Sequence, residues 1–149
     1  MKDRITSGFI AGIVAALAMN IVDWLGYLVG LYDERLLNWA SMMTLGRLPN
    51  NLFEVMFTQI EQIVFSGFLG IPFALILLKL TSGNYLFKGW LYGVIANEGI
   101  YAISILLKLD NFTTHTLNAT ISHFLSASVY GITLAYTLGV LDRRELGNI

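Results

Sequence analysis

The amino-acid sequence predicts an all-α integral membrane protein, a bundle of four transmembrane helices in a single domain that covers residues 1–149. Hydrophobic residues make up 56% of the chain and charged residues only 13%, whereas about a quarter of the residues of a soluble domain are charged. The apolar residues also form four runs long enough to cross a bilayer, because a hydrocarbon core roughly 30 Å thick needs about 20 helical residues. These runs lack the in-out alternation of barrel strands, so we predict helices.

The four spans follow one another with short connections, except after the first. We place them at Ile5–Leu31, Leu52–Leu80, Tyr85–Leu107 and Leu117–Leu141. The first run is too long for the apolar core of a signal peptide, so we expect it to stay as an anchor.

The longer connection after the first span predicts a short helix over residues 34–45. Asp33 is placed to cap this helix, and Gly46, followed by Pro49, is placed to end it. We expect the helix to lie along the membrane surface, and an ordered loop without membrane contact is the alternative.

Lysine and arginine residues gather on one side of the predicted bundle. That side holds Lys2, Arg4, Lys79, Lys88, Arg143 and Arg144, and the other holds Arg35, Arg47 and Lys108. Cytoplasmic ends and loops of membrane proteins carry the excess of basic residues. We therefore predict a multi-pass protein of the cell membrane with both termini in the cytoplasm.

A stripe of small residues that ends in asparagine occurs twice, with four-residue steps that keep it on one helical face. The two stripes are Gly12, Ala16 and Asn20 in the first span and Gly89, Gly93 and Asn97 in the third, 77 residues later. Spans two and four match at a distance of 61 residues, as in Gly70 and Gly131. We infer two tandem helical hairpins related by a pseudo-twofold axis along the membrane normal. Chance likeness between apolar helices is the alternative.

Seven polar or ionisable side chains inside the predicted spans form the candidate site. They are Asn20, Asp23, Glu61, Gln62, Asn97, Glu98 and His123. An ionised carboxylate in hydrocarbon is costly, so such groups face the bundle interior or water, pair with one another, or take up a proton. We predict a ligand-binding site in the outer half of the bundle, although the amides also fit plain hydrogen bonds between helices. Glu98 lies about 100° around its helix from Asn97, so one of the two faces away from the site.

Carboxylates and imidazole on facing helices are also how bundle cores hold Mn, Fe or Zn. Asp23, Glu61 and His123 are therefore the candidate ligands of a divalent metal. The chain has no cysteine, and His115 lies outside the predicted spans, so we expect neither an iron–sulfur cluster nor haem. Nine basic against ten acidic residues predict no nucleic-acid partner.

The function that these residues favour is binding or transport of an ion or small polar solute by a homo-oligomer in the lipid bilayer. One alternative is a partner subunit or assembly factor of a membrane complex, in which the polar core is structural. A membrane metalloenzyme is the second. The sequence favours a protein that is not an enzyme, because it contains no Gly-rich phosphate loop, His-Glu-x-x-His or Gly-x-Ser-x-Gly motif.

Overall fold

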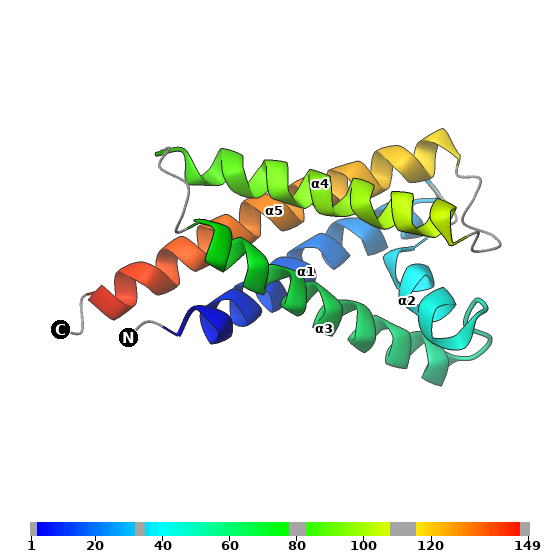
Figure 1. Ribbon diagram of the computed structural model, residues 1–149. Coiled ribbons are helices and arrows are strands. Elements are labelled where there is room, and N and C mark those ends of the chain that lie inside the picture. Colours follow the sequence, from blue (N-terminus) through cyan, green and yellow to red (C-terminus); the bar gives the residue numbers. More distant parts are fainter. Residues whose placement is uncertain (1–2, 32–34, 78–82, 108–115, 147–149) are drawn as a thin grey trace.

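The computed structural model describes residues 3–31, 35–77, 83–107 and 116–146, and this part of the chain forms helices and no strand. The helices are α1 (Arg4–Leu28), α2 (Leu36–Leu45), α3 (Leu52–Leu77), α4 (Tyr85–Leu106) and α5 (Leu117–Leu146). α1 packs on α3 and α5, α4 packs on α5, and the short α2 packs on α3. The two ends of the chain lie at one end of the molecule and α2 lies at the other (Figure 1). The all-α class and the short helix after the first long one are confirmed.

Three of the described helices are long and apolar enough to cross a membrane: α1, α3 and the Leu117–Asp142 part of α5. Large apolar side chains such as Ile21, Leu25 and Phe68 are exposed on their outer faces. These features suggest a membrane protein. The helix over the third predicted span, α4, does not reach the same hydropathy, since it contains Lys88, Asn97 and Glu98 as well as several glycine and tyrosine residues. The prediction of four equally apolar spans is therefore wrong for α4.

The first helix ends at Leu28, three residues before the predicted end. Gly30 adopts a left-handed conformation with a φ of 71°. Its N–H donates to the carbonyl of Tyr27, and the N–H of Leu31 donates to the carbonyl of Gly26. These two bonds are those of a glycine-terminated helix end, the Schellman motif. The apolar run continues to Leu31, but the helix does not.

Other boundaries also differ from the prediction. α2 begins at Leu36 and ends at Gly46, which has a φ of 68°. α5 continues to Leu146, five residues beyond the predicted Leu141, and Asp142 in this extension accepts a hydrogen bond from Arg4 over 2.7 Å. The following predicted features lie outside the described residues: Asp33, the end of the second span at Leu80, and the basic residues Lys2, Lys79 and Lys108.

Helix starts are capped by side chains that the sequence provides locally. The Asp3 carboxylate accepts the N–H of Thr6 at the start of α1 over 3.0 Å, and Asn84 accepts the N–H of Phe87 at the start of α4 over 3.1 Å. Hydrogen bonds from the Thr6 hydroxyl and N–H lower the pKa of the Asp3 carboxyl. This cap thus stays ionised, and fully effective, at neutral pH.

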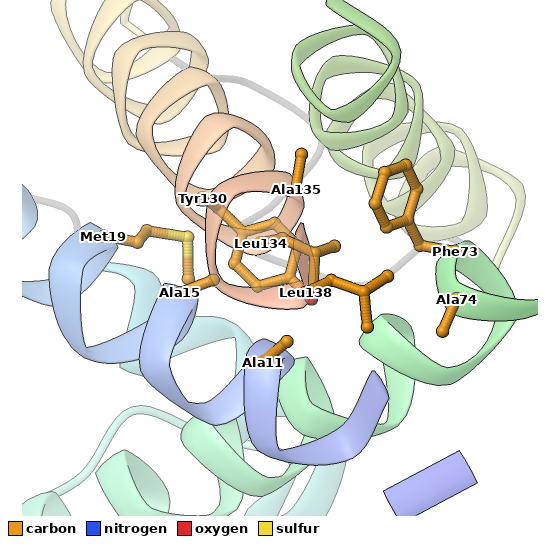
Figure 2. Close-up of a cluster of buried hydrophobic side chains, with 9 residues drawn as sticks. All are labelled: Ala11, Ala15, Met19, Phe73, Ala74, Tyr130, Leu134, Ala135 and Leu138. Carbon is orange, nitrogen blue, oxygen red and sulfur yellow. The ribbon is translucent and has the colours of Figure 1, made fainter. Parts of the chain in front are cut away.

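The apolar core lies where α1, α3 and α5 meet (Figure 2). It consists of Ala11, Ala15, Met19, Phe73, Ala74, Tyr130, Leu134, Ala135 and Leu138. The α1 side of the core is mostly alanine, which lets the two larger helices approach its backbone closely. α1 is therefore the central helix of the molecule.

Glycines bring the long helices together in two similar pairs. A Cβ at Gly70 would collide with the carbonyl oxygen of Gly8, and a Cβ at Gly131 would collide with that of Gly89. Gly89 follows Gly8 by 81 residues and Gly131 follows Gly70 by 61. The distance between the second and fourth spans is the predicted one, but that between the first and third is four residues longer than the predicted 77. Four residues are about one helical turn, so both alignments keep the same face.

Candidate functional site

A cavity of about 470 Å³ lies between α3 and α4, and we take it as the candidate site. The two helices meet near their connection, where the Tyr92 hydroxyl donates to the carbonyl of Leu69 over 2.5 Å. They diverge from there toward α2 (Figure 1). Tyr130 of α5 and Met19 of α1 form the floor, and Trp39 of α2 covers the wider end. This volume is typical of a site for a small molecule.

The wall of the cavity is mostly apolar and includes four aromatic side chains, Trp39, Phe65, Phe68 and Tyr130. Phe65 and Phe68 line the cavity and are nevertheless 48% and 57% exposed. The cavity is therefore open on the outer face of the molecule, between α3 and α4. Apolar side chains border this opening.

Four of the seven predicted site residues line this cavity: Glu61, Gln62, Asn97 and His123. Glu61 is half-buried, and its Oε2 atom is buried without a hydrogen-bond partner among the described residues. No lysine or arginine in the described part of the chain lines the cavity. Glu61 therefore contributes the acidic group of the wall, and no basic side chain of the wall balances it.

Two of the predicted amides form a hydrogen-bonded network that joins α1 to α3. Asn20 Nδ2 donates to Gln62 Oε1 over 2.7 Å, and Gln59 Nε2 donates to Asn20 Oδ1 over 2.8 Å. Gln59 Oε1 in turn accepts the indole N–H of Trp24 over 2.9 Å, and Gln62 Nε2 donates to the Ser66 hydroxyl over 3.2 Å. Asn20 does not line the cavity and acts on it through Gln62. This network has the form expected of polar contacts between transmembrane helices.

His123 forms the corresponding pair between α4 and α5. A hydrogen bond of 2.5 Å joins its Nδ1 to the Tyr101 hydroxyl. The Trp39 ring packs edge-on against Tyr101, with the centroids 5.2 Å apart, and lies 6.5 Å from the His123 ring. Tyr101 follows Asn20 by 81 residues and His123 follows Gln62 by 61, so the two polar pairs occupy equivalent places in the two glycine-linked helix pairs.

Asp23 lies outside the cavity and holds α2 in place. Its side chain is fully buried, and Oδ2 accepts the N–H of Leu36, the first residue of α2, over 3.1 Å. The neighbouring Arg35 guanidinium lies over the rings of Trp24 and Tyr27, 4.9 and 4.6 Å from their centroids. A carboxylate at this position satisfies a free N–H of the helix start. Asp23 thus links α1 to the helix that covers the cavity.

The connection from α2 to α3 is held by a second set of polar contacts. The Arg47 guanidinium donates two hydrogen bonds of 2.8 Å to the Glu54 carboxylate, which also accepts the N–H of Asn50. The hydrogen bond to Glu54 raises the pKa of Arg47. The Ser41 hydroxyl donates to the carbonyl of Arg47 over 2.5 Å. Together with Asp23, these contacts hold both ends of α2.

The structure does not assemble the candidate metal site. Among the described residues, no three His, Cys, Asp or Glu side chains lie together so that they could hold a metal ion. Glu61 and His123 share the cavity, but Asp23 lies outside it at the start of α2. Glu98 is also outside the cavity, because it is exposed on the outer face of α4 while the adjacent Asn97 lines the wall.

Sequence reasoning missed Tyr101, Trp39 and Gln59, which position the predicted residues. Aromatic and amide side chains inside apolar helices carry no local signal of such a role, although Tyr101 follows Asn20 by the distance that relates the two glycine contacts. In comparisons with protein-family models, curated proteins and solved structures, none matches this chain.

Proposed function

We propose that this chain is a multi-pass membrane protein whose cavity between α3 and α4 binds a small amphiphilic molecule from the bilayer. The observation that carries the proposal is the cavity itself, with its apolar wall, its few polar groups and its opening bordered by Phe65 and Phe68. Small-molecule sites combine an apolar lining with a few placed polar groups in this way. In a membrane, the opening faces hydrocarbon, and a ligand enters with its apolar part leading.

α4 crosses the bilayer beside α5 in this proposal. Its 22 residues span about 33 Å, enough for the hydrocarbon core. It packs along α5 through Gly89 and Gly93, whose missing side chains leave room for the α5 backbone. Its outer face exposes large apolar side chains such as Ile95 and Ile103. A helix in such contact with a spanning helix lies at the same depth.

Two tandem hairpins, α1 with α3 and α4 with α5, form the transmembrane bundle, related by a pseudo-twofold axis along the membrane normal. The matching glycine contacts and the matching polar pairs, Asn20 with Gln62 and Tyr101 with His123, support this arrangement. The excess of basic residues near the chain ends places both termini in the cytoplasm.

The geometry favours an amphiphile over the ion or small polar solute that the sequence alone suggests. A bare ion needs several ligands at once, and the described residues offer no such set. A small polar solute needs many hydrogen-bonding groups, whereas most of the cavity wall cannot form hydrogen bonds. The polar groups at Glu61, Asn97 and His123 suit one polar head.

The test is binding of a neutral apolar probe, N-phenyl-1-naphthylamine, to the protein in lipid nanodiscs. Energy transfer from Trp39, in a background of Trp24→Phe and Trp90→Phe, reports the cavity directly because Trp39 lines it. We expect saturable binding that Ala96→Trp abolishes, since Ala96 lines the cavity. Ala102→Trp, on the exposed face of α4, is the matched control and should bind as the parent does. Loss in both variants, or in neither, would overturn the proposal.

A second candidate function, assembly into a homo-oligomer, is favoured by the outer face of α4. Glu98 is exposed near the middle of this helix, and a Cβ added at the neighbouring Gly99 would meet nothing within 4 Å. A carboxylate that faces hydrocarbon is costly, so a second copy that covers it would stabilise the protein.

The absence of cysteine from the chain allows a clean crosslinking test. Gly99→Cys should form disulfide-linked dimers in membranes. Leu17→Cys, on the exposed face of α1, should not. Equal crosslinking of the two variants would count against an interface on α4.

A further inference from the structure

We infer that the polar head of the ligand is an organic cation, held by the Glu61 carboxylate and by the aromatic side chains of the cavity. The inference rests on the proposed function and names the ligand class: a lipophilic amine, ammonium or phosphonium compound. Its basis is the charge balance and the aromatic lining of the cavity, and the hydrogen bonds that its other polar groups already make.

The charge balance favours a cation. Glu61 Oε2 is buried without a hydrogen-bond partner among the described residues, and no basic side chain in that part of the chain lines the cavity. The two nearest arginines in the sequence are engaged elsewhere, Arg35 over the rings of Trp24 and Tyr27 and Arg47 with Glu54. A carboxylate in an apolar site is stable when an opposite charge or a hydrogen-bond donor pairs with it. A bound cation supplies that partner.

The hydrogen-bond donors that an anionic head would need are already used within the protein. Gln62 donates to the Ser66 hydroxyl over 3.2 Å, and the Ser66 hydroxyl donates to the carbonyl of Gln62 over 2.9 Å. The Tyr130 hydroxyl donates to the carbonyl of Ser66 over 2.6 Å. A phosphate or carboxylate head would meet the Glu61 carboxylate with few free donors to offset the repulsion.

The aromatic lining supplies the second part of a cation site. Trp39, Phe65, Phe68 and Tyr130 all present rings to the cavity. The face of an aromatic ring attracts a cation, more strongly where water is excluded. The rings also match the apolar body of the ligand, so one wall serves both parts of an amphiphilic cation.

The experiment compares two ions of the same shape and opposite charge, tetraphenylphosphonium and tetraphenylborate. Each competes with N-phenyl-1-naphthylamine for the parent protein in nanodiscs of uncharged lipid. We expect the cation to displace the probe and the anion to fail. Glu61→Gln should weaken binding of the cation about 10- to 100-fold, the usual worth of a hydrogen bond to a charged group. It should leave binding of the neutral probe unchanged, which also shows that the cavity is intact.

Glu98→Gln is the matched control, because it removes a carboxylate of the same protein outside the cavity. It should leave binding of the cation unchanged. Equal binding of the cation to the parent and to Glu61→Gln, or displacement by the anion as effective as by the cation, would overturn the inference and leave the proposed function standing. If Glu61→Gln loses the neutral probe as well, the comparison of the two ions on the parent decides. Failure of the neutral probe to bind the parent overturns the proposed function itself.

Discussion

Asp23 illustrates how one buried carboxylate can determine the position of a neighbouring helix. It belongs to α1, yet its hydrogen bond goes to the first N–H of α2. α2 contributes Trp39, Ala40 and Met43 to the cavity. The role of Asp23 is therefore that of a positioning residue, which acts on the site through α2 without contact with the ligand.

Asp23→Ala should loosen α2, because it removes the acceptor of a helix-start N–H at a cost of about 0.5–2 kcal/mol. Hydrogen–deuterium exchange of residues 36–45 should become faster in this variant. Asp23→Asn keeps an acceptor oxygen and should exchange nearly as the parent does. If Asp23→Asn abolished binding of the neutral probe while α2 exchanged normally, Asp23 would contact the ligand directly.

The sequence predicted part of the site at the residue scale. Glu61 and His123 could be selected because charge and imidazole are rare inside apolar helices, and both line the cavity. Asp23 was selected on the same signal, but its direction around α1 depends on where α2 lies, which no local pattern determines. The partner of His123, Tyr101, looked like any aromatic residue of an apolar helix.

At the scale of the helices, the glycine contacts determine how closely the hairpins pack. The carbonyl of Gly8 lies where a Cβ of Gly70 would be, and the carbonyl of Gly89 lies where a Cβ of Gly131 would be. A backbone carbonyl cannot rotate away as a flexible side chain can, so any larger residue forces the helices apart. The sequence predicted this packing face but misplaced the alignment of α1 with α4 by one turn.

Gly70→Ala should destabilise the protein by about 1–3 kcal/mol relative to Gly99→Ala, through overpacking of the contact with Gly8. Gly99 is the matched control because nothing lies within 4 Å of its added Cβ. The two changes share the gain in helix propensity, so their difference isolates the collision. Thermal unfolding in the same detergent measures it. Equal melting temperatures would mean that α1 and α3 do not pack through Gly8 and Gly70.

At the scale of the whole molecule, the cavity follows from which helices pack together. α1 joins the two hairpins through its contact with α5, while α3 and α4 make few contacts with each other. The polar network between α1 and α3 and the Tyr101–His123 pair between α4 and α5 strengthen this division. The space that remains between α3 and α4 is covered by α2. Sequence patterns predicted the helices but not this space, because it depends on long-range packing.

The last prediction concerns whether α4 crosses the membrane, since its polar residues make it the least apolar of the long helices. If it does, Gly83 before α4 and Leu117 at the start of α5 lie on opposite sides of the bilayer, and Gly83 faces the cytoplasm with both termini. Both residues are exposed, and the chain contains no cysteine that would compete. A membrane-impermeant maleimide applied to intact cells should therefore label Leu117→Cys, and should label Gly83→Cys after permeabilisation. Labelling of both from the same side would place α4 on the membrane surface, and the cavity between α3 and α4 would then open to water instead of lipid.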